Sequence, residues 1–384
     1  MAVAAPTVKG WCPGAYRPML SGDGLILRIR PHCARLTRQQ VAVICDLSNG
    51  FGNGLLDVTS RANLQIRGVA ERDHMRVLDA LAEHDLLDPT ADLEQRRNIL
   101  IDPFWAAGDL SFRIATRLMA ALAGFPAMPA KAGFAIDCGK TPLLARASAD
   151  IRFELADSGA LVLRADGAAQ GKVVTEDTAI EDALKLAQWF VDGLTQQKGR
   201  MRDQHVTRSL PAAWQHTQPR AEGPLPQPGK HPEGFLFALP FGKIAVHDLI
   251  KIAEQAPALR LTPWRIMLAE GVDHLAHPNI ITTPDHRLLT VDACSGKPYC
   301  ASAHIDTHRI ARALAPHVTG QLHVSGCAKG CARQAAADIV VVGTAEGCDI
   351  IENGTSHSAP NKTKVAQSDL LAGNLSPDAI HLRD

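Results

Sequence analysis

Four cysteines in two short, glycine-containing segments constrain this chain more than any other feature of its sequence. DACSGKPYCASA places five residues between Cys294 and Cys300, and SGCAKGCARQ places three between Cys327 and Cys331. A cubane 4Fe–4S cluster takes four thiolates, and two loops can enclose it from opposite sides. Structural zinc sites usually have about two to four residues within each cysteine pair, which the first pair exceeds. The pattern predicts a 4Fe–4S cluster, with zinc or four unligated core cysteines as the alternatives.

The remaining cysteines are isolated along the chain. The total of nine is odd, and in a reducing compartment such a count argues against a disulfide framework. Isolated cysteines commonly act as small buried apolar side chains. We expect that role for the five outside the two segments, which are Cys12, Cys33, Cys45, Cys138 and Cys348.

Composition bounds the class of protein. A length of 384 residues suits two or three domains, and an apolar content of 46% is enough for sizeable cores. Basic and acidic residues number 40 each, so nucleic acid is not expected as the main partner, although a local basic pocket is still allowed. No signal peptide pattern and no apolar run near the ~20 residues of a membrane span are present. We therefore expect a cytoplasmic protein without membrane contact.

The chain divides at a proline-rich segment, residues 196–234, into an N-terminal half, 1–195, and a C-terminal half, 235–384. The halves resemble each other at four places in the same order, for example SFRIATRLMAALAG at 111–124 and THRIARALAPHVTG at 307–320. Such an ordered series predicts an internal duplication. In the first half only Cys138, near the position equivalent to Cys327, remains of the cysteine pattern.

Hydrophobic periodicity predicts an α+β fold with mixed and antiparallel sheets covered by helices. Residues 64 and 66 alternate with 65 and 67 as inward and outward positions of a strand, and Thr37 is a suitable N-cap for a following helix. The expected strands are 25–30, 54–58, 63–67, 134–137, 151–155 and 160–164, and the expected helices are 37–47, 71–84, 111–123 and 180–194.

The cysteine spacing, the duplication and the segment TSRANLQIRG resemble the sulfite and nitrite reductases. In that family the fourth cysteine, here Cys331, also bridges the cluster to the iron of a bound sirohaem. The family's basic residues on the tetrapyrrole side correspond to Arg61, Arg97 in RRNILIDP, and Lys131 in MPAKAGFAI. A second lysine of the last segment is replaced by Gly133 in this chain, and loss of that cation weakens binding of a small oxyanion.

Within the superfamily, CPGAYRP, DGLILRIRP and NGLLDVTSRANLQIRGV resemble the precorrin-3B synthases of aerobic cobalamin biosynthesis. The resemblance implies a monooxygenase that uses O2 and NADH to hydroxylate precorrin-3A, after which a γ-lactone closes to give precorrin-3B. It also implies a ferredoxin-like segment and a cluster-less reductase-like part in 1–195. In the second half it implies a ferredoxin-like segment at 235–275 and a cluster-binding segment at 276–384. No G-x-G-x-x-G follows a strand, so a separate reductase is the expected route for electrons from NADH.

A tetrapyrrole with many carboxylates requires a basic pocket, and the arginine fork binds a carboxylate through two parallel hydrogen bonds. We expect this pocket in the half without a cluster. For each candidate the alternative is a solvated surface charge. The candidates are Arg30, Arg61, Arg67, Arg97 and Lys131.

The resemblance also implies an additional mononuclear non-haem iron, for which two histidines and a carboxylate are the usual ligands. His304 and His308 are spaced as i and i+4 on an expected helix, and His323 is a further candidate. Asp306 lies between the first two but on another helical face. Plain helix histidines are the alternative to a metal site.

Two other functions stay open at this stage, a sirohaem-dependent sulfite or nitrite reductase and a non-enzymatic iron–sulfur electron carrier. A monomer is the expected state.

Overall fold

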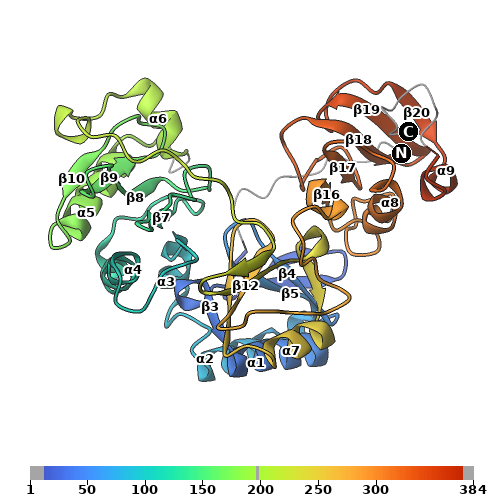
Figure 1. Cartoon of the computed structure of the whole chain (residues 1–384), viewed down its shortest axis with the longest axis horizontal. Helices are drawn as coiled ribbons and strands as arrows, with labels where there is room; N and C mark the ends of the chain where they lie inside the picture. Colours follow the sequence, from blue (N-terminus) through green and yellow to red (C-terminus); the bar gives the residue numbers. More distant parts are fainter. Residues whose placement is uncertain (1–12, 196–198, 375–384) are drawn as a thin grey trace.

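The computed structural model describes residues 13–195 and 199–374, which form three lobes (Figure 1). The amino lobe contains strands β6–β10, and the carboxyl lobe contains β16–β20. The central lobe lies between them and contains two further five-stranded sheets. Among the described residues, no helix is both long and apolar enough to cross a membrane.

The first central sheet, called the β2 sheet here, has the order β1-β2-β5-β4-β13, and all of its pairs are antiparallel. One face carries the apolar row Leu27, Ile66, Leu56 and Ile244, which belongs to the main core. The strands are β1 (Met19–Ser21), β2 (Gly24–Ile29), β5 (Leu64–Val69), β4 (Leu55–Val58) and β13 (Lys243–Ala245).

The second central sheet has the order β11-β12-β15-β14-β3. Its strands are β11 (Gly229–His231), β12 (Gly234–Ala238), β15 (Ile266–Glu270), β14 (Ala258–Leu261) and β3 (Arg35–Thr37). Helices on one side of the central lobe cover the two sheets (Figure 1). They are α1 (Arg38–Phe51), α2 (His74–Glu83) and α7 (Val246–Ala253).

The two halves of the chain exchange strands in the central lobe. β3, from the first half, pairs with β14 of the second half, and β13, from the second half, pairs with β4 of the first. Each exchanged strand follows a short turn that contains a residue with positive φ, Cys33 in one half and Phe241 in the other. The central lobe is therefore built from strands of both 1–195 and 235–384.

The amino lobe is a sheet of order β10-β9-β8-β7-β6 with helices beside it. Its strands are β6 (Ile99–Ile101), β7 (Phe134–Asp137), β8 (Ile151–Leu155), β9 (Leu161–Ala165) and β10 (Lys172–Val174). Its helices are α3 (Ala91–Arg96), α4 (Leu110–Ala121), α5 (Ala179–Asp192) and α6 (Met201–Thr207).

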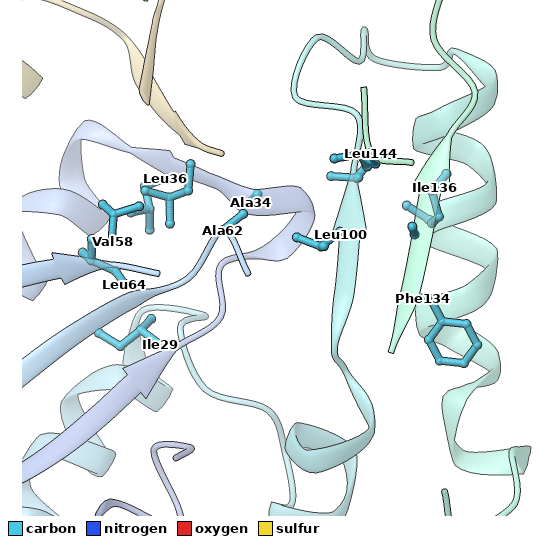
Figure 2. Packing of buried hydrophobic residues seen from close by; sticks show 14 of the residues in the cluster. Ile29, Ala34, Leu36, Val58, Ala62, Leu64, Leu100, Phe134, Ile136 and Leu144 are labelled. Carbon is cyan, nitrogen blue, oxygen red and sulfur yellow. The ribbon is translucent and has the colours of Figure 1, made fainter. Parts of the chain in front are cut away.

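The main hydrophobic core runs from the central lobe into the amino lobe. Figure 2 shows Ala34, Ala62 and Leu100 lying between the central residues, such as Leu64, and the amino-lobe residues, such as Phe134. Two small alanine side chains let the strands of the two lobes approach closely, so burial of apolar surface holds these lobes together.

The carboxyl lobe has the order β16-β17-β18-β19-β20. Its strands are β16 (Val291–Ala293), β17 (Leu322–Ser325), β18 (Ala337–Thr344), β19 (Gly347–Gly354) and β20 (Lys362–Val365). Its helices are α8 (Thr307–Leu314) and α9 (Gln367–Leu371).

The outer lobes share one topology, which supports the duplication. In each lobe, the first two strand pairs along the chain are parallel and the next two are antiparallel. Phe134 pairs with Ile151 as Leu322 pairs with Ile339, and Ile99 pairs with Phe134 as Val291 pairs with Leu322.

The expected secondary structure agrees with the observed elements within a few residues. Thr37 caps α1 through a capping box with Gln40. The proline-rich segment 196–234 contains helix α6, and part of it lies against the amino lobe, because Arg220 N–H donates to Leu155 and Gly171 bridges to Thr217. Those backbone bonds give the segment more order than its linker composition suggests.

Candidate functional site

The two cysteine segments meet at one edge of the carboxyl-lobe sheet. Cys294 follows β16 directly, and Cys327 comes two residues after β17. These strands are parallel, so their carboxyl ends lie at the same edge. The Gly326 N–H donates to Cys294 Sγ at 3.2 Å, and the Cys294 N–H donates to the Val324 carbonyl at 3.3 Å. Local sequence and parallel pairing together bring the two cysteine pairs to one place.

The other three cysteines of the two segments affect Cys331. Burial raises the pKa of the Cys331 thiol, and Cys294, Cys327 and Cys300 raise it further. Cys331 is exposed, whereas the other three are partly buried. Gly296 adopts a φ of +60°, and a Cβ there would lie 2.8 Å from the Thr307 amide nitrogen, so the tight path of this loop requires glycine.

The four thiols provide the donor set of an iron–sulfur cluster. Within residues 13–195 and 199–374, no three His, Cys, Asp or Glu side chains are close enough to hold one metal ion. A zinc site needs donors at about 2.0–2.3 Å from one centre. In a cubane each thiolate binds a different iron, so the sulfurs lie farther apart. The donor set, the N–H directed at sulfur and the glycine turn fit a 4Fe–4S cluster.

The amino lobe has acidic residues at the equivalent edge. Asp102 N–H donates to the Ile136 carbonyl at 2.8 Å, as Cys294 N–H does to Val324. The shared register therefore puts Asp102 at the position of Cys294 and Cys138 at that of Gly326. Burial raises the pKa of Asp102 to about 6 and that of Asp137 to about 7. One buried acid, Asp102, stands at the position of Cys294, and a second, Asp137, lies beside it at the position of Ser325.

His304 and His308 do not form the expected helical pair. Helix α8 begins at Thr307, and the Asp306 side chain caps it by accepting from the Arg309 N–H at 3.1 Å. His304 therefore lies in the preceding loop. His308 stacks on Phe241 with ring centroids 4.7 Å apart, and burial lowers its pKa to about 3. The prediction of a shared helical face was wrong because the N-cap aspartate starts the helix later.

His323 is fully buried, and neither ring nitrogen has a hydrogen-bond partner among the described residues. It lies beside Asp292 in the sheet register, and burial lowers its pKa. Within the described residues, no group of three His, Cys, Asp or Glu side chains that could hold a metal ion includes it.

Arg61 and Lys131 come together across the central and amino lobes. Arg61 Nη2 donates to the Lys131 carbonyl at 2.9 Å and to Ser148 Oγ at 3.2 Å. Both side chains are partly exposed. A side chain of the central lobe is thus bonded to the backbone of a residue 70 positions away in sequence.

Two of the expected carboxylate-binding arginines already have carboxylate partners. Arg97 forms a buried two-point ion pair with Asp88, at 2.7 and 2.8 Å. Arg67 pairs with Asp23 and Asp57, each at 3.2 Å. These arginines can shape a site, but their charge is neutralised within the protein.

Arg30 is buried and donates to the Glu94 carbonyl, while its Nε has no hydrogen-bond partner among the described residues. Burial lowers its pKa to about 10. It also lines a cavity of about 290 Å³ together with Tyr16, Gln95 and Ala130. Arg30 therefore remains a candidate for an anionic group.

Arg28 and Lys243 are basic residues that the sequence argument missed. Arg28, Gln65, Asp57 and Lys243 form one row across the polar face of the β2 sheet. Arg28 is 8% exposed, and its Nε and Nη1 have no partner among the described residues. Alternation along β2, with Leu27 and Ile29 in the core, could have placed Arg28 beside Arg30. No local signal places Lys243, because its strand belongs to the other half.

The other described cysteines are buried or partly buried thiols. Burial raises the pKa of Cys33 to about 11, of Cys45 to about 12 and of Cys348 to about 11, and it also raises that of Cys138. Cys45, Cys138 and Cys348 are buried, as expected, and Cys33 is partly buried. Cys12 lies outside the described residues.

The chain is similar to known proteins over most of its length. Residues 17–84 match the nitrite/sulfite reductase ferredoxin-like half domain. A precorrin-3B synthase from Sinorhizobium sp. is 29% identical over 396 aligned residues, which cover 92% of this chain and 84% of that protein. A ferredoxin–nitrite reductase from Synechococcus elongatus is 22% identical, covering 90% and 82%.

Among solved structures, the NirA protein of Mycobacterium tuberculosis superposes with a TM-score of 0.58 and 17% identity, covering 90% of this chain and 79% of that one. At that identity the likeness concerns the fold. The chain therefore has a nitrite/sulfite reductase-like fold and is similar in sequence to a precorrin-3B synthase.

Proposed function

We propose that this chain is a precorrin-3B synthase, an oxidoreductase of cobalamin biosynthesis. The observation that carries the proposal is the similarity to the Sinorhizobium enzyme over 92% of the chain. The proposed reaction hydroxylates precorrin-3A and closes a γ-lactone. One atom of O2 enters the product and the other leaves as water, with two electrons that come originally from NADH.

Gly133 distinguishes this proposal from oxyanion reduction. The reductases have a lysine there, whereas in this chain a Cβ at residue 133 would lie 2.7 Å from the Asn98 carbonyl oxygen. The Gly133 N–H and carbonyl are also bound to Asp150. Asn98 lies where a Cβ of residue 133 would be, and with glycine there the chain lacks a cation that a small oxyanion requires.

The residues of the chain have separate tasks in the proposed enzyme. Cys294, Cys300, Cys327 and Cys331 would hold the cluster, which supplies single electrons when bound. Arg28, Arg30, Arg61 and Lys131 would bind the substrate carboxylates, because charge-assisted hydrogen bonds to arginine fix both position and orientation. Arg97 and Arg67, held by aspartates, would keep neighbouring backbone in place.

The test is anaerobic purification and cluster reconstitution, followed by reaction with precorrin-3A, ¹⁸O2 and a chemically reduced electron donor. One ¹⁸O atom in a lactone-containing product supports the proposal. Unchanged precorrin-3A in the presence of a fully loaded cluster would refute it.

A sulfite or nitrite reductase is the second candidate, because the Synechococcus nitrite reductase aligns with 90% of the chain. That function predicts sirohaem bands in the visible spectrum of the purified protein and nitrite or sulfite consumption. An electron carrier would bind no tetrapyrrole, so equilibrium binding of precorrin-3A separates it from both enzymes.

A further inference from the structure

Lys243 occupies an unusual place for a lysine. It lies on β13, the strand that the second half inserts into the β2 sheet, directly opposite Asp57. Its Nζ is buried and has no hydrogen-bond partner among the described residues, and the nearest oxygen of Asp57 is 3.7 Å away. A buried ammonium is costly unless nearby groups use its charge.

The charge faces the loop that carries the first cysteine pair. Lys243 Nζ lies 4.3 Å from the centroid of the Tyr299 ring, and Tyr299 immediately precedes Cys300. The Tyr299 carbonyl accepts hydrogen bonds from Ser21 Oγ at 3.0 Å and Arg67 Nη2 at 3.2 Å. The polar face of the β2 sheet therefore holds this loop by its backbone and by its aromatic ring.

A second connection runs to Cys294. Phe241, two residues before Lys243, stacks on His308 with ring centroids 4.7 Å apart, and Thr307 Oγ1 donates to the Cys294 carbonyl at 2.5 Å. The segment that carries Lys243 therefore contacts Tyr299 near one end of the Cys294–Cys300 loop and the start of α8, which holds Cys294, at the other end.

The charges around Lys243 are balanced. Two cations, Lys243 and Arg67, lie with two carboxylates, Asp23 and Asp57. Arg67 contacts both carboxylates, and Lys243 contacts Asp57. Removing Lys243 therefore leaves one net negative charge beside the loop, and removing Asp57 leaves one net positive charge. This place is poorly solvated, so Coulomb interactions there are stronger than in water.

We propose that Lys243 sets the reduction potential of the iron–sulfur cluster by placing a buried positive charge against the Cys294–Cys300 loop. The inference rests on the cluster of the proposed function. Reduction adds negative charge to a cluster, so a nearby cation stabilises the reduced form, and nearby charge is one of the determinants of cluster potential.

The test is a dye-mediated redox titration of the reconstituted full-length chain, followed by electron paramagnetic resonance of the reduced cluster. Lys243→Met is expected to shift the midpoint to more negative values, and Asp57→Asn to more positive values. Lys243→Arg keeps the charge and should restore the parent midpoint. Iron and sulfide per chain are measured in every variant, so that only fully loaded samples are compared.

Opposite shifts in Lys243→Met and Asp57→Asn support the inference. Unchanged midpoints, or shifts of the same sign, overturn it, because a loosened loop gives no sign reversal. If the Lys243→Met variant binds no cluster, the midpoint potential of Asp57→Asn decides alone. A shift to more positive values supports the inference, and any other result overturns it. A parent protein without iron and sulfide would refute the cluster as well, whereas a loaded, active parent with unchanged variants would refute only the role of Lys243.

Discussion

Arg97 and Asp88 form an ion pair in which Nε and Nη2 donate to the two carboxylate oxygens at 2.7 and 2.8 Å, and both side chains are buried. The resemblance to the reductases implied a tetrapyrrole-side role for Arg97. In the structure the charge of Arg97 is neutralised by Asp88.

Removing one partner of this pair should lower the free energy of unfolding, with a smaller effect on the affinity for substrate. Arg97→Met leaves the Asp88 carboxylate buried without its cation, which typically costs about 3–5 kcal/mol. Denaturant unfolding of Arg97→Met and of the double variant Arg97→Met/Asp88→Leu measures the effect. The double variant should recover part of the loss, and equal losses in both would contradict the explanation.

Replacing a cluster cysteine should lower the iron content, whereas replacing another cysteine should not. Cys331→Ala is expected to lose most of the roughly four irons of a cubane, because one iron is left without its thiolate. Cys348→Ala, which alters a buried thiol in the same lobe, is the matched control and should keep iron and sulfide. Metal and sulfide analysis after anaerobic reconstitution gives the result, and equal iron in both variants would contradict the assignment.

Arg28 should contribute to binding of an anionic tetrapyrrole. Its two buried nitrogens lack partners in the described chain, and a hydrogen bond to a charged group is worth about 1.5–3 kcal/mol. Arg28→Met should therefore weaken precorrin-3A binding by about 10- to 100-fold. Arg38→Met, which removes an arginine that contacts the Ala253 and Ala256 carbonyls, is the control and should bind normally. Anaerobic absorption titrations distinguish the two outcomes.

Replacing Gly133 by lysine, the residue expected in the reductases, should destabilise the protein. A Cβ would lie 2.7 Å from the Asn98 carbonyl, so both Gly133→Ala and Gly133→Lys are expected to destabilise the amino lobe. Overpacking of this kind typically costs about 1–3 kcal/mol. Gly124→Ala, with open space around its Cβ, is the control in thermal unfolding. A Gly133→Lys protein of normal stability that reduces nitrite would contradict both the packing argument and the proposed function.

The buried acid that replaces Cys294 predicts a pH dependence. Burial raises the pKa of Asp102 to about 6, so the folded state keeps a proton that the unfolded state has already lost above about pH 4. Because the native state binds more protons in this window, the contribution of Asp102 to stability falls as pH rises from about 4 to 6. The free energy of unfolding of Asp102→Asn should fall less over this pH range. Unfolding free energies of both proteins between pH 4 and 8 provide the measurement, and identical slopes would contradict it.

The sequence alone predicted the features that depend on residues close together in the chain. Cysteine spacing, glycines and the strand–turn pattern predicted the two loops that meet in the carboxyl lobe. Local periodicity and the Thr37 cap gave most helices and strands, because capping and amphipathicity act over a few residues. The ordered similarities between the halves predicted the shared topology of the outer lobes.

Only the tertiary structure decided which charges have partners. Arg67 contacts Tyr299, a residue 232 positions away, and Lys243 reaches that loop because the halves exchange strands. Residue type predicts that an arginine can bind a carboxylate, but folding brings Asp88 to Arg97 and leaves two nitrogens of Arg28 without a partner in the described chain. Pairing of charges depends on contacts between distant segments, and no local pattern in the sequence records those contacts.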